Sequence, residues 1–286
     1  ISASRRIDIP AFYCTWLINR IRAGFCTVPN PYNHRQITFV SLQPDDVDAV
    51  VFWTRNPRPL FSHLDELDAR GFRYYFQYTL INNPRTLDPY SPRVEAAVRT
   101  FRELAERVGP ERVIWRYDPI VLSNLTNAAF HLDNFALIAA HLSGYTQRCV
   151  ISVMDWYRKI EGRMREVEQQ GVIVDKDNGS AFPEFAALAA GIAAVAGVYG
   201  VEVASCAEEL DLQCYGIQHG RCVDGDLIQR IFGVTVDAGK DPNQRTACGC
   251  VASRDIGMYD GCLFGCQYCY ATSQFAQAAL RDVAGN

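Results

Sequence analysis

The chain has 286 residues, of which 49% are hydrophobic and 21% are charged, and its net charge is −4. These are ordinary values for a globular protein, and the acidic balance argues against nucleic acid as a partner. The longest apolar stretch, Phe185 to Tyr199, is too short to span a bilayer, so we expect no membrane partner.

Short β-branched or aromatic runs alternate with longer helical patterns along the chain. Proline near a first turn and glycine at an end delimit several helices, and Ser91 is expected to cap the helix that follows it. In chain order, we predict a strand at Ile1–Ser4, a helix at Pro10–Ala23, a strand at Val50–Thr54, a helix at Pro59–Arg70, a strand at Arg73–Leu80, a helix at Pro92–Val108, a strand at Arg112–Tyr117, a helix at Asn127–Leu142, a strand at Cys149–Met154, helices at Trp156–Gln170 and Pro183–Ala196, a strand at Val201–Ser205, a strand at Ala252–Met258 and a helix at Tyr270–Val283.

Repeated alternation of strands and helices implies a mainly parallel sheet in an α/β protein. Roughly seven such units favour a full or partial parallel (β/α) barrel, with a doubly wound open sheet as the alternative. The length fits a single barrel domain over residues 1–286. The polar stretch Asp237–Arg245 is interpreted as a loop that enters the last strand.

Several predicted strands end in polar or charged residues, which is where a parallel barrel forms its active site. Arg116 and Asp118 lie in an otherwise apolar segment, where a buried charge needs a partner. A set of polar strand ends favours an enzyme over a protein that only carries electrons. The candidate site residues at these ends are Ser2, Ser4, Arg5, Arg6, Gln77, Thr79, Arg116 and Asp118.

Eleven cysteines are many for a chain of this length. Secreted proteins that use cysteines as disulfides are usually short and loop-rich, whereas this chain is long and rich in predicted helices. The opening stretch from Ile1 to Arg6 lacks the apolar core of a signal peptide. We therefore expect a reduced cytoplasmic protein whose cysteines bind metal or lie in the core.

The most informative stretch is Cys262-Leu-Phe-Gly-Cys266-Gln-Tyr-Cys269. Three thiolates at this spacing converge when they lie on a loop. Three ligands on a four-iron cluster leave one iron open, as a reactive cluster needs, whereas a fully ligated cluster suits electron transfer or structure. The spacing therefore predicts a [4Fe–4S] cluster, with a zinc knuckle or three reduced core thiols as the alternatives.

This cysteine pattern is the hallmark of the radical S-adenosylmethionine superfamily, and an aromatic residue before the third cysteine, here Tyr268, is also typical of it. The wider string from Met258 to Ala271 is similar to the signature of the spore photoproduct lyase-like branch. The whole chain, with its opening Ile-Ser-Ala-Ser-Arg-Arg, resembles an uncharacterised bacterial family related to that branch.

In that superfamily the cysteine loop usually follows the first barrel strand, whereas here it lies near the end of the chain. A circular permutation explains the difference. Ala252–Met258 would then be the first strand and Ile1–Ser4 the second, and the two ends of the chain would lie close together, which a closed barrel tolerates.

The resemblance implies that S-adenosylmethionine chelates the open iron and that the reduced cluster passes one electron to its sulfonium. Methionine and a 5′-deoxyadenosyl radical result, and the radical takes a hydrogen atom from an unidentified small-molecule or peptide substrate. An electron donor such as flavodoxin or ferredoxin is implied as well.

The resemblance also suggests which residues hold S-adenosylmethionine. Tyr268 would pack near the adenine. The other contacts fall into two sets. Ser2, Ser4, Arg5 and Arg6 would lie near the methionyl amino group, and Gln77, Thr79, Arg116 and Asp118 would contact the ribose and the carboxylate, unless the last four only orient one another.

A second group of cysteines lies in polar, glycine-containing surroundings, which suit metal ligands better than core residues. Its members are Cys206, Cys222, Cys248 and Cys250, so residues 206–250 are interpreted as an auxiliary metal-binding insertion. We predict a second iron–sulfur cluster there, with zinc as the next choice. The remaining cysteines, Cys14, Cys26, Cys149 and Cys214, are interpreted as packing or incidental.

Three functions follow from these patterns. The first is a radical S-adenosylmethionine enzyme. The second is an iron–sulfur electron carrier or a zinc-stabilised structural protein without a substrate. The third is a repair or modification enzyme for nucleic acid, which the acidic balance disfavours.

Overall fold

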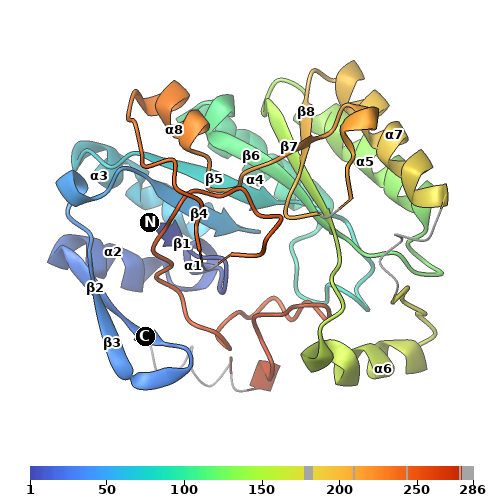
Figure 1. The fold of residues 1–286 in the computed structure, drawn as a ribbon, viewed down its shortest axis with the longest axis horizontal. Coiled ribbons are helices and arrows are strands. Elements are labelled where there is room, and N and C mark those ends of the chain that lie inside the picture. Colours follow the sequence, from blue (N-terminus) through green and yellow to red (C-terminus); the bar gives the residue numbers. More distant parts are fainter. Residues whose placement is uncertain (177–182, 209, 243, 277, 279–286) are drawn as a thin grey trace.

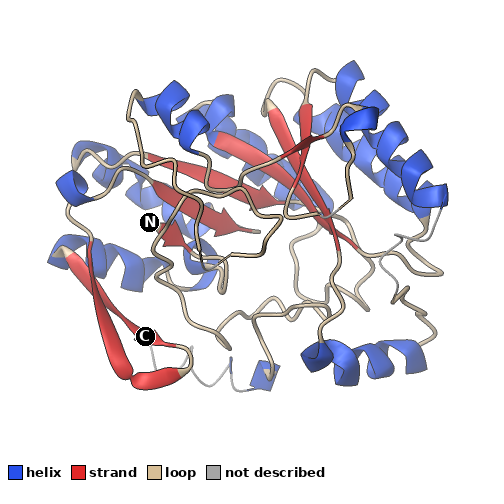
Figure 2. Cartoon of the chain, viewed as in Figure 1, coloured by secondary structure: helices blue, strands red, loops and turns tan. Residues whose placement is uncertain are grey.

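The computed structural model describes residues 1–176, 183–208, 210–242, 244–276 and 278. Its centre is a seven-stranded sheet, with a separate two-stranded hairpin at its side (Figure 1). Figure 2 shows most of the helices, in blue, arranged around the outside of the red strands. None of the helices in the described ranges is long and apolar enough to cross a membrane.

Every neighbouring pair of strands in the large sheet is parallel, and the strands lie side by side in the order in which they occur along the chain. The predicted α/β class with a mainly parallel sheet is therefore confirmed. In spatial order the strands are β1 (Ser2–Ala3), β4 (Val50–Thr54), β5 (Tyr74–Thr79), β6 (Val113–Ile120), β7 (Arg148–Val153), β8 (Glu202–Ser205) and β9 (Gln218–His219).

The predicted strand at Ala252–Met258 is wrong in its extent. Only Asp255 forms a bridge, parallel to Ser2 of β1. The amide of Ser2 donates to the carbonyl of Arg254 at 2.8 Å, and the amide of Ile256 donates to the carbonyl of Ser2 at 3.0 Å. The pairing ends there because β1 itself has only two residues.

The helices connect the strands in the predicted order, but three predicted spans differ. The helix predicted at Pro10–Ala23 is divided at Tyr13, the first half of the one predicted at Pro59–Arg70 is a 3₁₀ helix (Arg58–His63), and the one predicted at Trp156–Gln170 begins at Glu161. The α-helices are α1 (Ile9–Phe12), α2 (Cys14–Ala23), α3 (Leu64–Ala69), α4 (Val94–Val108), α5 (Ala128–Leu142), α6 (Glu161–Gln169), α7 (Pro183–Val198) and α8 (Gly225–Phe232). The side chains of Asp8, Asn127 and Asp224 cap the first turns of α1, α5 and α8.

Two further predictions about helix ends need correction. Ser91 does not cap α4, because the helix begins after Arg93 and the Ser91 hydroxyl instead accepts a hydrogen bond from Arg55. The helix predicted at Tyr270–Val283 does not begin at Tyr270, since residues 270–274 are not helical. Most of its second half lies outside the described residues.

Some elements were not predicted at all. They are the antiparallel hairpin of β2 (Phe25–Asn30) and β3 (Asn33–Ser41), the short strand β9 and the helix α8. The residues at both ends of α8 are typical of helix ends, and the sequence could have indicated this helix. Asp224 caps its start, and Gly233, at φ +70°, ends it.

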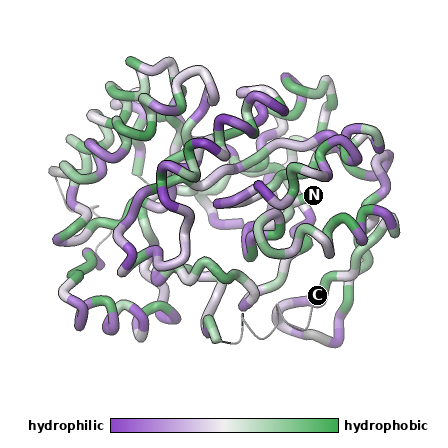
Figure 3. Tube along the Cα trace, turned by 180° about the vertical axis from the view of Figure 1, so that it is seen from behind, coloured by the Kyte–Doolittle hydropathy of each residue, from purple (hydrophilic) through white to green (hydrophobic). Residues whose placement is uncertain are grey.

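Side chains alternate between the two faces of the sheet, as the two-residue period of a strand requires. Aromatic residues such as Phe76 and Trp115 pack with the helices in the main core. On the other face, Tyr75 and Ile114 pack against a second cluster that includes Leu227 of α8. The hydropathy colours in Figure 3 mix along the outer helices, as expected when one side of each helix is buried.

A candidate metal and cofactor site

A cavity of about 420 Å³ opens at the carboxyl edge of the sheet. It is lined from the ends of β1, β4, β5, β6 and β7 by, among others, Ser4, Thr54, Thr79, Asp118 and Ser152. Ligands of open parallel sheets bind at this edge, because the strand ends present their polar loops there. The volume falls in the usual range of small-molecule sites, about 300–1,000 Å³.

The cysteine loop forms one wall of this cavity, which Cys262, Cys266 and Cys269 all line. Each of the three is only partly buried. The loop is tied to the body of the protein on two sides. The hydroxyl of Tyr13 donates to the carbonyl of Gly261 at 2.8 Å, and the amide of Gln267 donates to the carbonyl of Leu87 at 2.9 Å.

Gly265 sits between the first two cysteines with φ +67°, a conformation that residues with a side chain rarely adopt. A Cβ atom added here would also lie 2.9 Å from the ring of Tyr90. Glycine at this position therefore allows the loop both to turn and to pack closely against its neighbour.

Tyr268 is buried and carries a polar network behind the cysteines. Its hydroxyl donates to the Asp88 carboxylate at 2.7 Å and accepts from Arg55 Nη2 at 2.8 Å. Arg55 and Asp88 also form an ion pair at 3.5 Å. Tyr268 lines the cavity, as a contact to adenine would require, and its hydroxyl attaches the loop to the body of the protein. Sequence reasoning missed Asp88, whose only signal was a lone acid in a proline-rich loop.

The four residues predicted near the start of the chain do not all lie at the cavity. Ser4, Arg5 and Arg6 line it, whereas Ser2 is fully buried beneath them. Asp255, which was not predicted, accepts hydrogen bonds from the hydroxyls of Ser2 at 3.0 Å and Ser4 at 2.6 Å. These two serines therefore hold the chain segments together.

The guanidinium of Arg5 reaches toward the second group of cysteines. Its Nη1 donates to Ser253 at 3.2 Å, and its carbon lies 5.1 Å from the ring centre of Trp53. Nη2 is buried and has no hydrogen-bond partner in the described part of the chain. The Cys250 thiol lies beside the same guanidinium.

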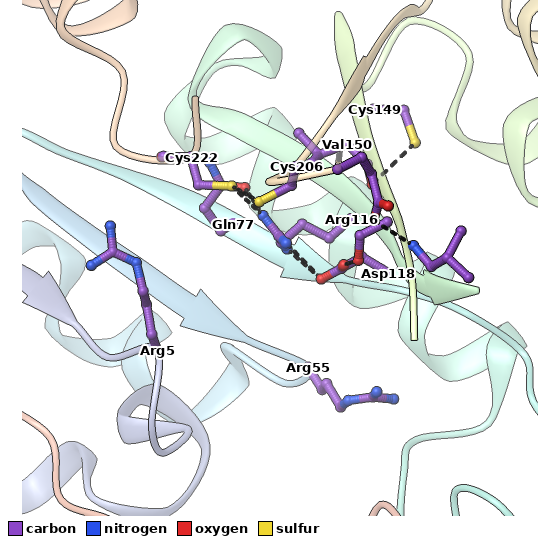
Figure 4. Close-up of polar contacts among 12 residues, drawn as sticks. Arg5, Arg55, Gln77, Arg116, Asp118, Cys149, Val150, Cys206 and Cys222 are labelled. Atoms are coloured by element: carbon purple, nitrogen blue, oxygen red, sulfur yellow. Dashed lines mark hydrogen bonds and ion pairs between the residues drawn. The ribbon is translucent and has the colours of Figure 1, made fainter. Parts of the chain in front are cut away.

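Arg116 links the strand ends to the cysteines, as Figure 4 shows. Its Nη2 lies 2.6 Å from the Asp118 carboxylate, and its Nη1 donates to Cys222 Sγ at 2.7 Å. Gln77 does not line the cavity, since its amide donates to the Cys222 carbonyl at 2.9 Å and accepts from Arg116 at 3.3 Å. Arg116, Asp118 and Thr79 do line it.

The four cysteines of the second group come together on the same cavity. The sulfur atoms of Cys206 and Cys222 are 3.0 Å apart. Cys250 Sγ accepts hydrogen bonds from the amides of Cys222 and Val223, each at 3.3 Å. Cys248 lies near enough to Cys250 for the two thiols to interact.

The other cysteines lie where packing residues would. Cys14, Cys26 and Cys149 belong to the main core, and Cys214 is exposed. In Figure 4, Cys149 lies apart from the cluster around Cys222.

A family model described as a domain of unknown function, DUF1848, matches residues 1–271. The chain belongs to the DUF1848 family. No curated protein and no solved structure is significantly similar to it. The match covers both groups of cysteines and every strand end that lines the cavity, so the site lies within the DUF1848 domain.

In this DUF1848 chain the cysteine side chains are not arranged around one point. Across the described ranges, no three or more His, Cys, Asp or Glu side chains are grouped so that they could hold a single ion. A cluster of several irons makes a different demand, since each thiolate then binds its own iron.

The electrostatics differ between the two groups of thiols. Burial, and then the charge of Cys269, raises the pKa of Cys262 to about 12, and burial raises the pKa of Cys266 well above its usual range. A metal bound there would have to displace these protons. In the second group, interactions between the thiols lower the pKa of Cys206 and of Cys250 and raise the pKa of their partners Cys222 and Cys248.

Proposed function

We propose that this protein is a radical S-adenosylmethionine enzyme that holds a [4Fe–4S] cluster through Cys262, Cys266 and Cys269. The observation that carries the proposal is that these three thiols share one short loop and line one wall of a cavity of about 420 Å³. A four-iron cluster held by these three thiolates would have one iron without a protein ligand, and the cavity would have room for a second ligand there.

The chemistry of the surrounding residues fits such a cluster. Thiolates are the usual ligands of iron–sulfur clusters, and the cluster with its thiolates needs compensation for negative charge in a partly buried site. The Arg55 guanidinium lies close enough to Cys266 to interact with its charge. It is held in place by Asp88 and Tyr268, so it does not depend on the metal for its position.

A (β/α) barrel that begins at a different point of the chain is part of the proposal. The spatial order of the strands follows the chain in one direction, as it does in a barrel. The segment around Asp255 lies parallel to β1, on the side of β1 that faces away from β4. In a permuted barrel that segment would be the strand before the cysteine loop. The contacts of residues 2–6 with residues 253–257 support this interpretation.

When bound, the cluster would supply one electron that splits S-adenosylmethionine into methionine and a 5′-deoxyadenosyl radical, which takes a hydrogen atom from the substrate. The protein's residues would bind and orient the molecule. The amino acid part of S-adenosylmethionine carries both charges. The cavity offers both as well, since Arg6 and the ion pair of Arg116 and Asp118 line it. Thr79 and the ring of Tyr268 complete the lining on the side of β5 and the cysteine loop.

The alternative is an iron–sulfur electron carrier or a zinc-stabilised structural protein. Neither needs a polar cavity of this size in front of the cysteines. Neither alternative would cleave S-adenosylmethionine, so one experiment separates both of them from the proposal.

The test is anaerobic incubation of the reconstituted protein with S-adenosylmethionine and dithionite, in place of a natural donor such as flavodoxin or ferredoxin. We expect 5′-deoxyadenosine and methionine to form, and the electron paramagnetic resonance spectrum of the reduced protein to change on addition of S-adenosylmethionine. The variant with Cys262, Cys266 and Cys269 all replaced by Ala should lose both responses.

Cys214→Ala is the matched control, because this thiol is exposed and does not line the cavity. It should behave as the wild type does. The assignment is wrong if the triple variant still cleaves S-adenosylmethionine. It is also wrong if the spectrum of the reduced wild-type protein does not change when S-adenosylmethionine is added.

A further inference from the structure

We infer that Cys206, Cys222, Cys248 and Cys250 hold a second iron–sulfur cluster, which faces the same cavity as the cysteine loop. All four line that cavity although they come from three separate segments. Cys206 follows β8, Cys222 follows β9, and the pair of Cys248 and Cys250 precedes the bridge to β1.

Backbone hydrogen bonds hold these segments together at the cavity. The amide of Cys206 donates to the carbonyl of Ile151 in β7 at 2.9 Å. The amide of Val251 donates to the carbonyl of Val223 at 3.0 Å, which brings Cys250 beside Cys222. The cysteines are therefore positioned by the sheet and by its neighbouring loops rather than by contacts among themselves alone.

The thiols form a row of close neighbours. Cys206 Sγ lies 3.0 Å from Cys222 Sγ, the amide of Cys222 donates to Cys250 Sγ at 3.3 Å, and Cys248 lies near enough to Cys250 for the two thiols to interact. One zinc ion would need four sulfur atoms at about 2.3 Å from a single point. Sulfur atoms this close suit one zinc ion as well as a cluster of several irons, so the metal content distinguishes the two centres.

Two arginines supply positive charge at this row. Arg116 donates to Cys222 Sγ at 2.7 Å, and the Arg5 guanidinium lies beside Cys250. The buried Nη2 atom of Arg5 has no hydrogen-bond partner in the parts of the chain that the structure describes. A buried donor of this kind is costly unless it meets an acceptor, and the sulfur atoms of a cluster are acceptors of the right charge.

The number of ligands indicates the role of this cluster. Four thiolates close all four iron positions, which suits electron transfer or structure and leaves no iron for a substrate. The second cluster would thus face the cavity as an electron carrier. The inference uses none of the three cysteines of the loop, so it and the proposed function can fail independently.

The experiment is to count iron and acid-labile sulfide in anaerobically reconstituted protein. We expect about eight of each per wild-type chain, twice the content of one cluster. The variant in which Cys262, Cys266 and Cys269 are all replaced by Ala should keep about four of each. The electron paramagnetic resonance spectrum of this variant should not change when S-adenosylmethionine is added, since every iron of the remaining cluster has a protein ligand.

A second variant, Cys222→Ala with Cys250→Ala, should also hold about four irons but should keep the spectral response to S-adenosylmethionine. The control Cys214→Ala should keep the wild-type content. Wild-type protein with only about four irons, or with one zinc in addition to them, would overturn the inference even if a variant fails to fold. Eight irons without cleavage of S-adenosylmethionine would support it while refuting the proposed function.

Discussion

Arg116 shows how one residue can serve both the fold and the site. Its side chain is only 6% exposed, and a charge that deeply buried requires partners on every side. Asp118 neutralises it at 2.6 Å, Gln77 accepts a further hydrogen bond, and the remaining donor meets the sulfur of Cys222. The sequence interval of two residues between Arg116 and Asp118 makes the ion pair local, whereas Cys222 arrives from far along the chain.

Replacing this arginine should be costly. In Arg116→Met, the carboxylate of Asp118 loses its counter-ion in a mostly buried place, so we expect the metal-free protein to lose about 3 kcal/mol of its free energy of unfolding. The double variant with Asp118→Asn should recover part of the loss, because no unpaired charge then remains. Denaturant unfolding measures both.

The exposed ion pair of Arg22 and Glu66 provides the comparison, with an Arg22 side chain that is 50% exposed. Arg22→Met should change the stability little, since water screens such pairs. Equal effects of Arg22→Met and Arg116→Met would contradict the burial argument.

At the scale of elements, a buried polar network joins α5 to β6. The His131 ring lies between the hydroxyl of Tyr117 at 2.9 Å and the carbonyl of Val121 at 3.0 Å. Asn134 adds a hydrogen bond to the same hydroxyl at 3.0 Å. The ring is neutral in this place because burial lowers the pKa of His131 to about 4.

This pKa predicts how stability depends on pH. Between about pH 4 and pH 6.5 the histidine of the unfolded chain binds a proton and that of the folded chain does not. The folded state therefore loses about 3 kcal/mol as the pH falls through this window, and the loss ends below the folded pKa. Unfolding of the metal-free protein at a series of pH values should show it.

His131→Asn should flatten the profile in that window. His141→Asn, on the same helix but exposed, should leave the profile as it is. An unchanged slope in His131→Asn would mean that other groups cause the acid sensitivity.

At the scale of the whole molecule, Asp255 joins two regions that lie at opposite ends of the sequence. Its carboxylate accepts hydrogen bonds from Ser2, Ser4, the amide of Arg5 and the amide of Gly257. The residues that lead into the cysteine loop are thereby attached to β1 and to the polar residues that follow it. The position of the loop thus depends on a contact between the two ends of the domain.

Asp255→Asn should weaken this attachment. The amide offers one acceptor oxygen where the carboxylate has two, and its own NH2 group faces donors, so we expect a loss of about 2 kcal/mol. Hydrogen exchange should also quicken at the amides of Ser2 and Ile256. The exposed Asp45→Asn is the control and should alter neither. Unchanged exchange in Asp255→Asn would show that the backbone contacts suffice.

The sequence by itself determined most of the central sheet, the helices between its strands and one wall of the site. Each strand between Val50 and Ser205 and the helices around them follow from local patterns, because the period of apolar residues reports secondary structure directly. Cys262, Cys266 and Cys269 lie within eight residues of one another, so the spacing alone predicted that they share one loop. The polar ends of parallel strands likewise had to meet at one edge of the sheet.

Only the tertiary structure decided which distant residues meet. Asp88 behind Tyr268, Asp255 beneath Ser2 and Ser4, and the row of thiols beside Arg116 all join segments that are far apart in the chain. Such contacts depend on strand order, register and loop path, which no local period encodes. For the same reason the sequence assigned Ser2 and Gln77 to the cavity by strand position, while packing left both outside its lining.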